Sequence, residues 1–349
     1  MMKKILKIKS DMKLHNSAKI FITIILFFDL LHSNAQMSSI PRLAKNGSYT
    51  QLIVDDKPFF ILGGELGNSS ASSNEYMRPI WPKLKQMNLN TVIAPVYWEL
   101  MEPVEGKFDF SLVDSLIKNA RLFNMKLAIL WFGAWKNSMS CYAPAWVKTN
   151  TTRFPRVLDK SGSPQEIMTP FNKNNLEADK KAFVRLMQYI KETDNKDHTV
   201  ITVQVENEIG MLPDARTYDE AANLAFNKAV PEQLLNYLKK NRNVLLPEIK
   251  SIWEGNGSKT SGTWEEIFGK SLSTDEIFMA WYYADFANEL AIAGKIISFV
   301  ARHSSRTLPI NSKNRKHFVA SLPAWPQLIP GRRCDPAAPS APCAPCFAF

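Results

Sequence analysis

The 349-residue sequence has few of the residues that build disulfide frameworks, metal sites and phosphate-binding loops. It has four cysteines, and Cys141 is the only one between residues 36 and 300, so no disulfide framework is expected in that part. The five histidines are scattered and no HExxH run occurs, so no metal site is predicted. Neither GxGxxG nor GxxxxGK[ST] occurs, and nucleotide-binding folds therefore lack their motif. No cofactor is expected.

Excess positive charge is confined to the two ends of the chain. The formal net charge is +10. Residues 1–35 hold six lysines against two aspartates, and residues 296–349 hold seven lysines and arginines against one aspartate. Residues 36–295 balance, with 30 basic and 30 acidic side chains. A nucleic-acid-binding protein would carry its positive charge on the folded part, so no nucleic-acid partner is expected.

Residues 1–35 are typical of an export signal. Six lysines precede the apolar run 20–31, and Ser33-Asn34-Ala35 resembles a small-residue cleavage site. The apolar run is short for a membrane-spanning helix, so a cleaved signal peptide is favoured over a stable membrane anchor. The hypothesis is a bacterial protein exported to the periplasm or secreted.

From residue 36 onward, apolar runs alternate with amphipathic segments. Strands are predicted at 59–64, 90–97, 125–132 and 199–205, helices at 75–87, 111–123, 176–193, 232–240 and 275–295, and a hairpin at 52–60. Repeated strand–helix units with near-continuous apolar strands indicate a parallel sheet. This length favours an α/β fold of the (β/α)8 TIM-barrel class over a doubly wound sheet. About the first four βα units are predicted, within a domain at 36–300.

Polar and aromatic residues follow each predicted strand, where such barrels carry their chemistry. The apolar run from Val200 ends in Glu206, Asn207 and Glu208, and charge there is costly unless the strand opens onto a site. Carboxylates and flat apolar rings suit sugars, which need acid/base groups and stacking platforms. The other candidates of these two kinds are Glu65, Glu99, Glu102, Trp98, Trp131, Trp135 and Trp146. Each tryptophan could equally be a core residue, and Glu102 could merely end a strand.

Three runs of residues resemble glycoside hydrolase family 35, which consists mainly of β-galactosidases in a clan of retaining (β/α)8 glycosidases. The run 204–210 (QVENEIG) resembles the family signature QVENEYG. The runs 98–103 (WELMEP) and 143–147 (APAWV) resemble its WNLHEP and PAWL, and the similarity covers roughly residues 41–295. The resemblance implies a barrel glycosidase and a carbohydrate substrate, a β-galactoside or related plant or host glycan.

The resemblance also implies roles for individual residues. It makes Glu208 the general acid/base and Asn207 the hydrogen-bond partner of the sugar 2-hydroxyl. Glu206, one residue back, would point to the other face of the strand and support the site. Glu65, Trp98, Glu99 and Trp135 are the further expected substrate-binding residues.

The sequence departs from the family pattern in the second and third strand-end runs. Glu99 and Met101 replace the usual Asn and His of WNLHEP, and Gly133-Ala134-Trp135 replaces AEW, whose Glu contacts galactose. The runs GELGNSS, FGAWKNS and ENEIGML resemble a subgroup from polysaccharide-degrading gut bacteria. Galactose specificity is thereby less strongly implied than β-glycoside hydrolysis.

The C-terminal region lacks the second catalytic carboxylate that the family requires. The last glutamate is Glu289, so no later residue can be the nucleophile glutamate that the family places on the seventh strand. Residues 301–349 lose all periodicity and hold eight of the 21 prolines, three cysteines (Cys334, Cys343, Cys346) and one acid. The tail is either a basic, Pro-rich linker or interaction segment, or, as favoured here, an out-of-frame end of a C-terminally truncated barrel.

Two hypotheses on function follow. One is an exported, retaining β-glycosidase of β-galactosidase type, inactive as written because its nucleophile is missing. The alternative is a non-catalytic carbohydrate-binding protein or a decaying glycosidase remnant.

Overall fold

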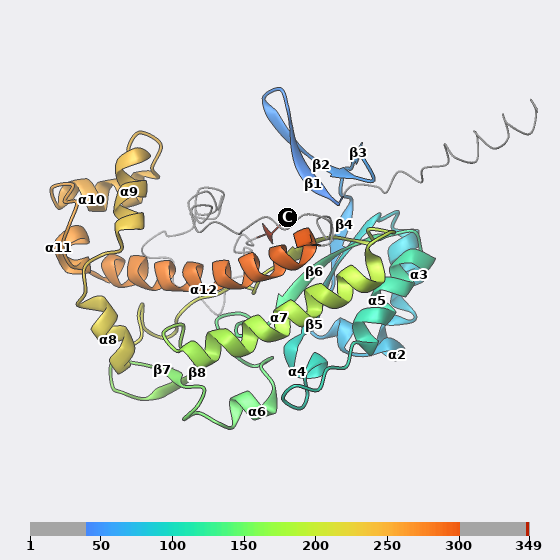
Figure 1. The fold of residues 1–349 in the computed structure, drawn as a ribbon, viewed down its shortest axis with the longest axis horizontal. Coiled ribbons are helices and arrows are strands. Elements are labelled where there is room, and N and C mark those ends of the chain that lie inside the picture. The colour runs from blue at the N-terminus through green and yellow to red at the C-terminus, as the bar shows by residue number, and fades with distance from the viewer. Residues whose placement is uncertain (1–39, 301–346, 349) are drawn as a thin grey trace, which may run out of the picture. The chain divides into compact units, whose positions relative to one another are not determined.

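The computed structural model describes residues 40–300 and 347–348 (Figure 1). The chain divides into two compact units, 1–40 and 41–349, and the first contributes only Ile40 to the described residues. The predicted export signal and almost all of the predicted tail therefore lie outside the described residues. Among the residues that are described, no helix is both long and apolar enough to cross a membrane.

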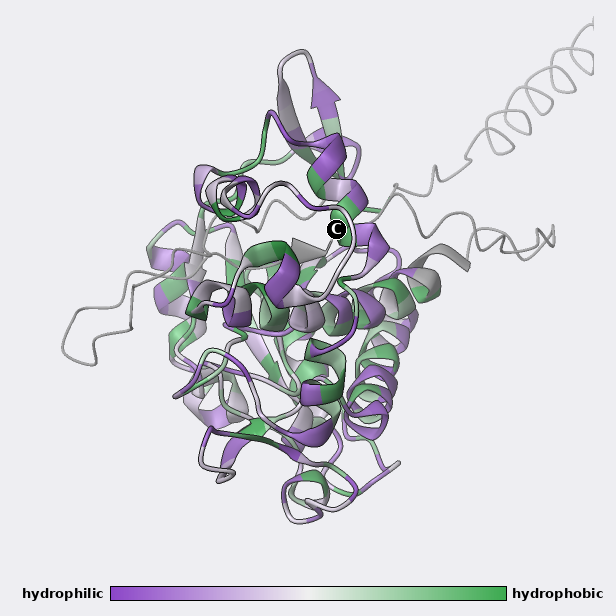
Figure 2. Cartoon of the chain, turned by 90° about the vertical axis from the view of Figure 1, so that its left-hand side faces the viewer, coloured by the Kyte–Doolittle hydropathy of each residue, from purple (hydrophilic) through white to green (hydrophobic). Residues whose placement is uncertain are grey.

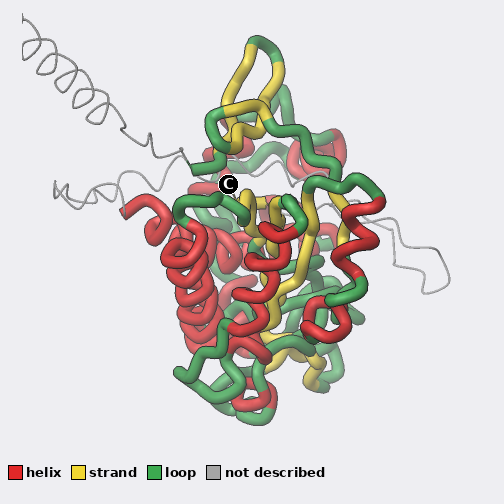
Figure 3. Tube along the Cα trace, turned by 90° about the vertical axis from the view of Figure 1, so that its right-hand side faces the viewer, coloured by secondary structure: helices red, strands yellow, loops and turns green. Residues whose placement is uncertain are grey.

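A parallel sheet forms the centre of the larger unit. Its parallel strands lie in chain order and are β4 (Gly63–Glu65), β5 (Thr91–Tyr97), β6 (Lys126–Phe132) and β9 (Val200–Gln204). The two-residue strand β10 (Phe347–Ala348) pairs antiparallel with β9. β5, β6 and β9 are almost wholly buried, as expected for parallel strands that are covered on both faces. This order confirms the predicted fold class, with the first four strands of the barrel side by side (Figure 3).

Helices between the strands cover the sheet. α5 (Ser111–Leu122) joins β5 to β6, and α7 (Lys173–Asp194) precedes β9. α5 buries Val113, Leu116, Ile117 and Ala120, the spacing of one helical face. The long helix α12 (Leu272–Val300) packs along α7 (Figure 1). α5 and α7 each have a hydrophobic and a hydrophilic side, and Figure 2 shows residues of both kinds along the helices.

Shorter elements occupy the connections between strands and long helices. They are η1 (Ser70–Ser72), α2 (Asn74–Met77), α3 (Ile80–Gln86), α4 (Trp98–Met101), α6 (Ala145–Lys148), β7 (Arg156–Leu158), β8 (Pro164–Met168), α8 (Glu220–Phe226), α9 (Glu232–Lys240), α10 (Pro247–Gly255) and α11 (Trp264–Phe268). The β7–β8 hairpin and helices α8, α10 and α11 were absent from the sequence-based prediction. The two strands, α8 and α11 are too short for periodicity to separate helix, strand and loop, whereas α10 has nine residues, as many as the predicted α9.

The predicted hairpin belongs to a small antiparallel sheet of β1 (Arg42–Asn46), β2 (Tyr49–Val54) and β3 (Lys57–Pro58). It turns at Asp55 and Asp56, whose φ angles are +51° and +59°. The Asp55 carboxylate lies 3.0 Å from Lys126 Nζ and 3.1 Å from His198 Nδ1. Lys126 is the first residue of β6 and His198 precedes β9, so the hairpin contacts the N-terminal ends of the strands.

The first strand is shorter than predicted. It begins at Gly63, and Phe60, Ile61 and Leu62 before it are 84%, 40% and 48% exposed. The side chain of Asn90 binds this backbone instead: it donates to Phe60 O (2.8 Å) and accepts from Leu62 N (2.9 Å). Side-chain bonds to the main chain replace the start of the ladder.

The first helix is interrupted where one continuous helix was predicted. α2 ends at Met77 and α3 begins at Ile80, with Pro79 between them. Proline has no N–H to continue the helical bonds and its ring clashes with the preceding turn, so the break falls there.

A buried ion pair joins α5, α7 and β9 near the N-terminal ends of the strands, and its loss should destabilise the fold. Asp194, 3% exposed, accepts from Arg121 Nη2 (2.6 Å) and from Val200 N (2.7 Å). We expect Asp194→Ala to lower the free energy of unfolding by about 1–3 kcal/mol, because Val200 N loses its buried acceptor and Arg121 keeps only its contacts with Asp197, Thr193 and Thr199. Urea unfolding measures this. Glu105→Ala, which breaks the exposed Arg153–Glu105 pair, is the control and should leave the midpoint unchanged; equal losses would contradict the prediction.

Candidate functional site

The predicted site residues of the fourth strand lie against the loop that follows the third. Glu206, Asn207 and Glu208 come directly after β9, and residues 133–139 come directly after β6. Lys136 and Asn207 form an isolated parallel bridge, and Ser138 N donates to Glu208 O (2.8 Å). The structure therefore holds both segments together at the C-terminal edge of the sheet.

Glu208 presents a partly exposed carboxylate beside a buried cation. Its side chain is 35% exposed, and Oε2 lies 3.4 Å from Lys136 Nζ. The Lys136 side chain is only 8% exposed, and its Nζ also binds Asn137 Oδ1. Glu208 can thus meet a ligand from solvent while an ammonium group fixes its position.

Asn207 carries a buried side-chain acceptor that has no partner in the described part of the chain. The residue is 8% exposed, and its Oδ1 has no hydrogen-bond partner among the described residues. A buried polar atom without a partner loses its hydration, so such atoms are nearly always paired. A donor from a bound molecule, such as a sugar hydroxyl, would satisfy it.

Glu206 lies in a very different environment from Glu208, although only one residue separates them. It is 1% exposed, and its carboxyl accepts from Trp135 N (2.8 Å) and Ala134 N (3.2 Å). Asp179 of α7, fully buried, accepts from Trp131 Nε1 (2.9 Å) and from the same Ala134 N (3.0 Å). The two carboxyl groups also bond each other.

This buried pair retains a proton. Burial, followed by the negative charge of Asp179, raises the pKa of Glu206 well above its ordinary 4.5. Burial also raises the pKa of Asp179. Two ionised carboxylates in contact would repel each other strongly in a site without water. Glu206 is therefore the protonated partner and donates its proton to Asp179.

Glycine is the one residue type that fits at position 133, beside the carboxyl groups of Glu206 and Asp179. A Cβ there would lie 2.3 Å from Trp131 Nε1, 2.4 Å from Glu206 Oε1 and 2.6 Å from Asp179 Oδ1. The loop after β6 can approach the carboxyl groups closely only because position 133 lacks a side chain.

The backbone of the strand-end segment is held in an uncommon conformation. Glu206 and Glu208 have φ angles of +62° and +48°, in the left-handed region that non-glycine residues rarely adopt. Such residues cost on the order of 1–3 kcal/mol each, and they cluster at functional sites. Gln204 Nε2 donates to Glu206 O (2.9 Å) and helps to hold the first of them.

The structure corrects three of the four predicted tryptophan platforms; the fourth, Trp146, is half-buried and donates its indole N–H to Glu102 O (3.0 Å). Trp98, Trp131 and Trp135 are fully buried, so none offers a face to a sugar. The indole of Trp98 donates to Glu102 Oε2 (2.8 Å), and that of Trp135 donates to Met168 O (3.1 Å). These rings belong to the core because the helices and loops close over them.

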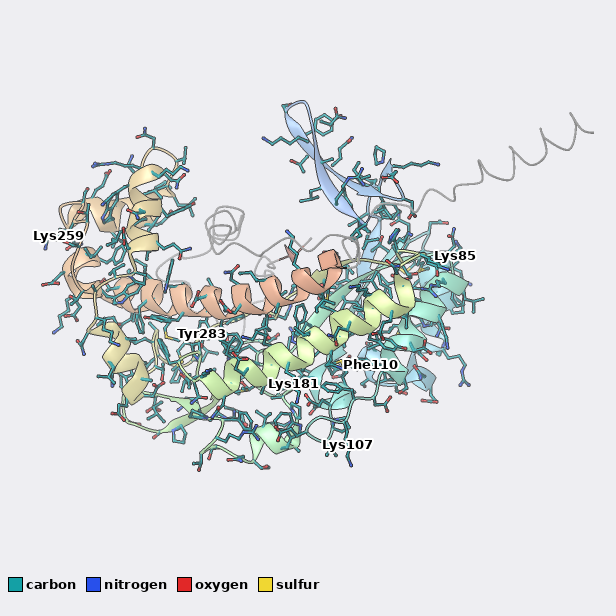
Figure 4. The ribbon with its side chains drawn as sticks, in the orientation of Figure 1. Lys85, Lys107, Phe110, Lys181, Lys259 and Tyr283 are labelled. Atoms are coloured by element: carbon teal, nitrogen blue, oxygen red, sulfur yellow. The ribbon has the colours of Figure 1, made fainter. Side chains whose placement is uncertain are left out.

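Trp135 packs instead against α12, a helix far away in the sequence. Its ring meets Tyr283 at 5.1 Å and Phe286 at 4.5 Å between centroids, both edge to face. Tyr283, labelled in Figure 4, donates its hydroxyl to Gly210 O (2.8 Å). α12 therefore supports both site segments from behind.

The remaining predicted residues, Glu65, Glu99 and Glu102, are not in contact with the Glu206–Asp179 pair in any hydrogen bond or ion pair that the structure shows among the described residues. Glu65 is exposed at the end of β4. Glu99 pairs with Lys148 (3.0 Å). Glu102 is 1% exposed and also accepts from Gly106 N (2.8 Å), so it holds a turn.

Sequence reasoning missed Asp179, Lys136 and Tyr142. Asp179 stands on the apolar face of its helix, spaced three from Leu176 and four from Phe183, and a charge on that face is a readable signal. Tyr142 is a partly exposed ring beside Tyr97 and Phe132, at 5.4 and 5.1 Å, and nothing in the sequence distinguishes it.

Within the described part of the chain, no set of three His, Cys, Asp or Glu side chains could hold a metal ion.

Comparison with known proteins places the chain among glycosidases. The sequence model of the β-galactosidases of glycoside hydrolase family 42 matches residues 70–280, more than half of the chain. "Beta-galactosidase-1-like protein 3" of Rattus norvegicus is 29% identical over 185 residues, which are 51% of this chain and 27% of that protein. The Homo sapiens protein of the same name is 31% identical over 167 residues, 46% of this chain and 23% of that protein.

The chain thus spans about a quarter of the length of these two curated relatives. Among solved structures, a β-galactosidase from a psychrophilic Marinomonas is similar with a TM-score of 0.47 and 14% identity. That match covers 69% of this chain and 36% of the other.

The protonated state of Glu206 makes stability fall as pH rises. Above about pH 4.5 the unfolded chain has released this proton while the folded chain keeps it, so up to about 1.4 kcal/mol is lost per pH unit until the raised pKa is passed. We expect Glu206→Gln, which keeps the shape and the hydrogen bond to Asp179, to be more stable than wild type by a margin that grows with pH over this window.

Urea unfolding at several pH values tests this prediction. Glu206→Ala is the matched control: it loses the hydrogen bonds and should be less stable than Glu206→Gln at every pH. A constant difference between wild type and Glu206→Gln from pH 4 to 8 would show that the pair holds no extra proton.

Gly133 should tolerate no side chain. Gly133→Ala places a Cβ within 2.6 Å of three polar atoms, so we expect a loss of about 1–3 kcal/mol in the free energy of unfolding. The control is Gly255→Ala at the end of α10, where a Cβ meets no atom within 4 Å. A thermal unfolding scan that finds the two variants equally stable would contradict the close approach.

Proposed function

Because the chain belongs to the β-galactosidase family whose sequence model it matches over residues 70–280, we propose that it is a glycosidase of β-galactosidase type. Its proposed substrates are terminal β-galactosides of oligo- or polysaccharides. The observation that carries the proposal is the juxtaposition of a partly exposed Glu208 with Asn207, whose Oδ1 has no partner. One group can transfer a proton and the other can hold a sugar hydroxyl.

In this proposal Glu208 is the general acid/base of a retaining reaction. It protonates the glycosidic oxygen as the leaving group departs, and later takes a proton from the attacking water. Asn207 Oδ1 accepts from the sugar 2-hydroxyl, a bond that strengthens in the transition state. Glu65 and Glu99 line the same edge of the sheet and contribute hydrogen bonds to substrate.

The assignment of the site to family 35, although the sequence model that the chain matches is that of family 42, is part of the proposal. It rests on the runs 204–210, 98–103 and 143–147. Where that family carries a galactose-contacting glutamate, this chain has Ala134, which is fully buried. The two carboxyl groups nearest to this position, those of Asp179 and Glu206, both accept from the Ala134 main-chain N–H instead. We therefore propose a β-galactoside whose galactose unit is recognised differently from the family pattern.

We further propose that the 349 residues alone do not complete a turnover. Retaining hydrolysis needs a second carboxylate about 5–5.5 Å from the first. No glutamate follows Glu289, which lies on α12 within 4.0 Å of Lys180. Glu65 and Glu99 follow the first two strands, where Glu65 is exposed and Glu99 pairs with Lys148, and both are poor nucleophile candidates.

Two further parts of the proposal concern the ends and the alternative function. Export rests on the lysine-rich, apolar N-terminal 35 residues, which suit the periplasm or secretion. The alternative is a carbohydrate-binding protein without turnover, which the same Asn207–Glu208 arrangement would serve. The gene sequence beyond codon 349, read in all three frames, separates them: a later strand-end glutamate favours the enzyme.

Ligand binding and turnover test the proposal directly. We expect residues 36–349 to bind a galactose-configured iminosugar, which mimics the charge of the transition state, and to show no hydrolysis of aryl β-galactosides. Asn207→Ala should weaken binding about tenfold, equal to about 1.4 kcal/mol. The control is Asn241→Ala at the end of α9, which should bind as wild type does. Absence of binding would overturn the proposal, and hydrolysis abolished by Glu208→Ala would show that a nucleophile is present.

A further inference from the structure

Asp179 joins three parts of the barrel at one buried point below the strand ends. It comes from α7, and it accepts from the Trp131 indole of β6 and from the main chain of Ala134 in the following loop. Through the shared proton it also holds Glu206, beyond β9. No role in sugar binding is open to it, because it is fully buried.

The hydrogen-bonding capacity of this cluster is closely matched. Three N–H donors, from Trp131, Ala134 and Trp135, meet two carboxyl groups, and Ala134 N is shared between them at 3.0 and 3.2 Å. One acid proton links the carboxyl groups. Removing either carboxyl leaves buried donors unpaired, which costs about 1–3 kcal/mol for each group.

The cluster lies directly against the strained segment. Glu206, whose φ is +62°, is bound through its side chain to Asp179, Ala134 and Trp135. The left-handed φ of Glu208 is reached two residues later, with only Asn207 between. Without side-chain anchors, this backbone would relax toward the extended form that most residues prefer.

We propose that Asp179 is a positioning residue: by holding Glu206 from α7, it fixes the backbone that aims Asn207 and Glu208 at the ligand. The expected effect on ligand binding rests on the proposed function. The effect of Asp179 on the backbone at 206–208 does not depend on that function. Asp179 acts through Glu206 and touches no substrate.

Hydrogen–deuterium exchange of the amides at 206–210 tests the positioning in the full chain. Asp179→Ala should accelerate their exchange at least about tenfold, because the segment opens more readily. Asp179→Asn should restore part of the protection, since its oxygen still accepts from the Trp131 indole, while Ala134 N, from which an amide nitrogen cannot accept, keeps Glu206 Oε1 as its acceptor at 3.2 Å. Asp194→Ala is the matched control: another buried aspartate of α7, it should accelerate exchange near Val200 and leave 206–210 unchanged.

A second variant covers failure of Asp179→Ala to fold. Trp131→Phe removes one donor to Asp179 and keeps an aromatic ring in the core, and it should accelerate exchange at 206–210 by about threefold. Wild-type exchange at 206–210 in a folded Asp179→Ala, or in Trp131→Phe where the first does not fold, would overturn the proposal. Equal acceleration at 206–210 in Asp194→Ala would show that Asp179 contributes only to the general stability of the fold, and would also overturn the proposal.

Affinity separates this proposal from the proposed function. Below the unfolding temperature of every variant, Asp179→Ala should bind the galactose-configured iminosugar about tenfold more weakly, while Asp179→Asn and Asp194→Ala bind as wild type does. If the wild-type chain does not bind the iminosugar, the proposed function fails, and the exchange rates at 206–210 still decide the role of Asp179.

Discussion

The strand-end region depends on a single proton held between two buried carboxyl groups. Glu206 follows β9 and Asp179 lies on α7, and their carboxyl groups meet beside the loop that begins at Gly133. Neither could be buried as a charged neighbour of the other, so the proton is a condition of the fold. It lets three elements converge where a barrel builds its site, and it makes stability fall as pH rises.

The same interaction explains why neighbouring glutamates have different roles. Glu206 points into the core and satisfies main-chain N–H groups of Ala134 and Trp135. Glu208 stays partly exposed beside Lys136. A buried acid and an exposed acid two residues apart require the backbone to turn sharply between them, and the left-handed φ angles at both positions provide that turn.

Aromatic residues organise the core around this cluster and do not form a sugar platform. Trp131 donates to the carboxyl pair, while Trp135 packs against Tyr283 and Phe286 of α12. α12 begins 64 residues after Glu208 in the sequence and yet stabilises the loop that faces it. The loop after β6 is therefore packed against α12, and the Glu208 side chain is partly exposed to solvent.

The sequence by itself determined the parallel strand order and the strand ends at Glu206–Glu208, because continuous apolar runs followed by charge have one economical arrangement. Only the tertiary structure decided that Trp98 and Trp135 are buried and that Asp179 reaches Glu206. An indole ring packs equally well in a protein core or against a sugar ring, so the local sequence pattern cannot decide between the two positions. The partner of a buried acid depends on which helix packs there, which no spacing along the chain encodes.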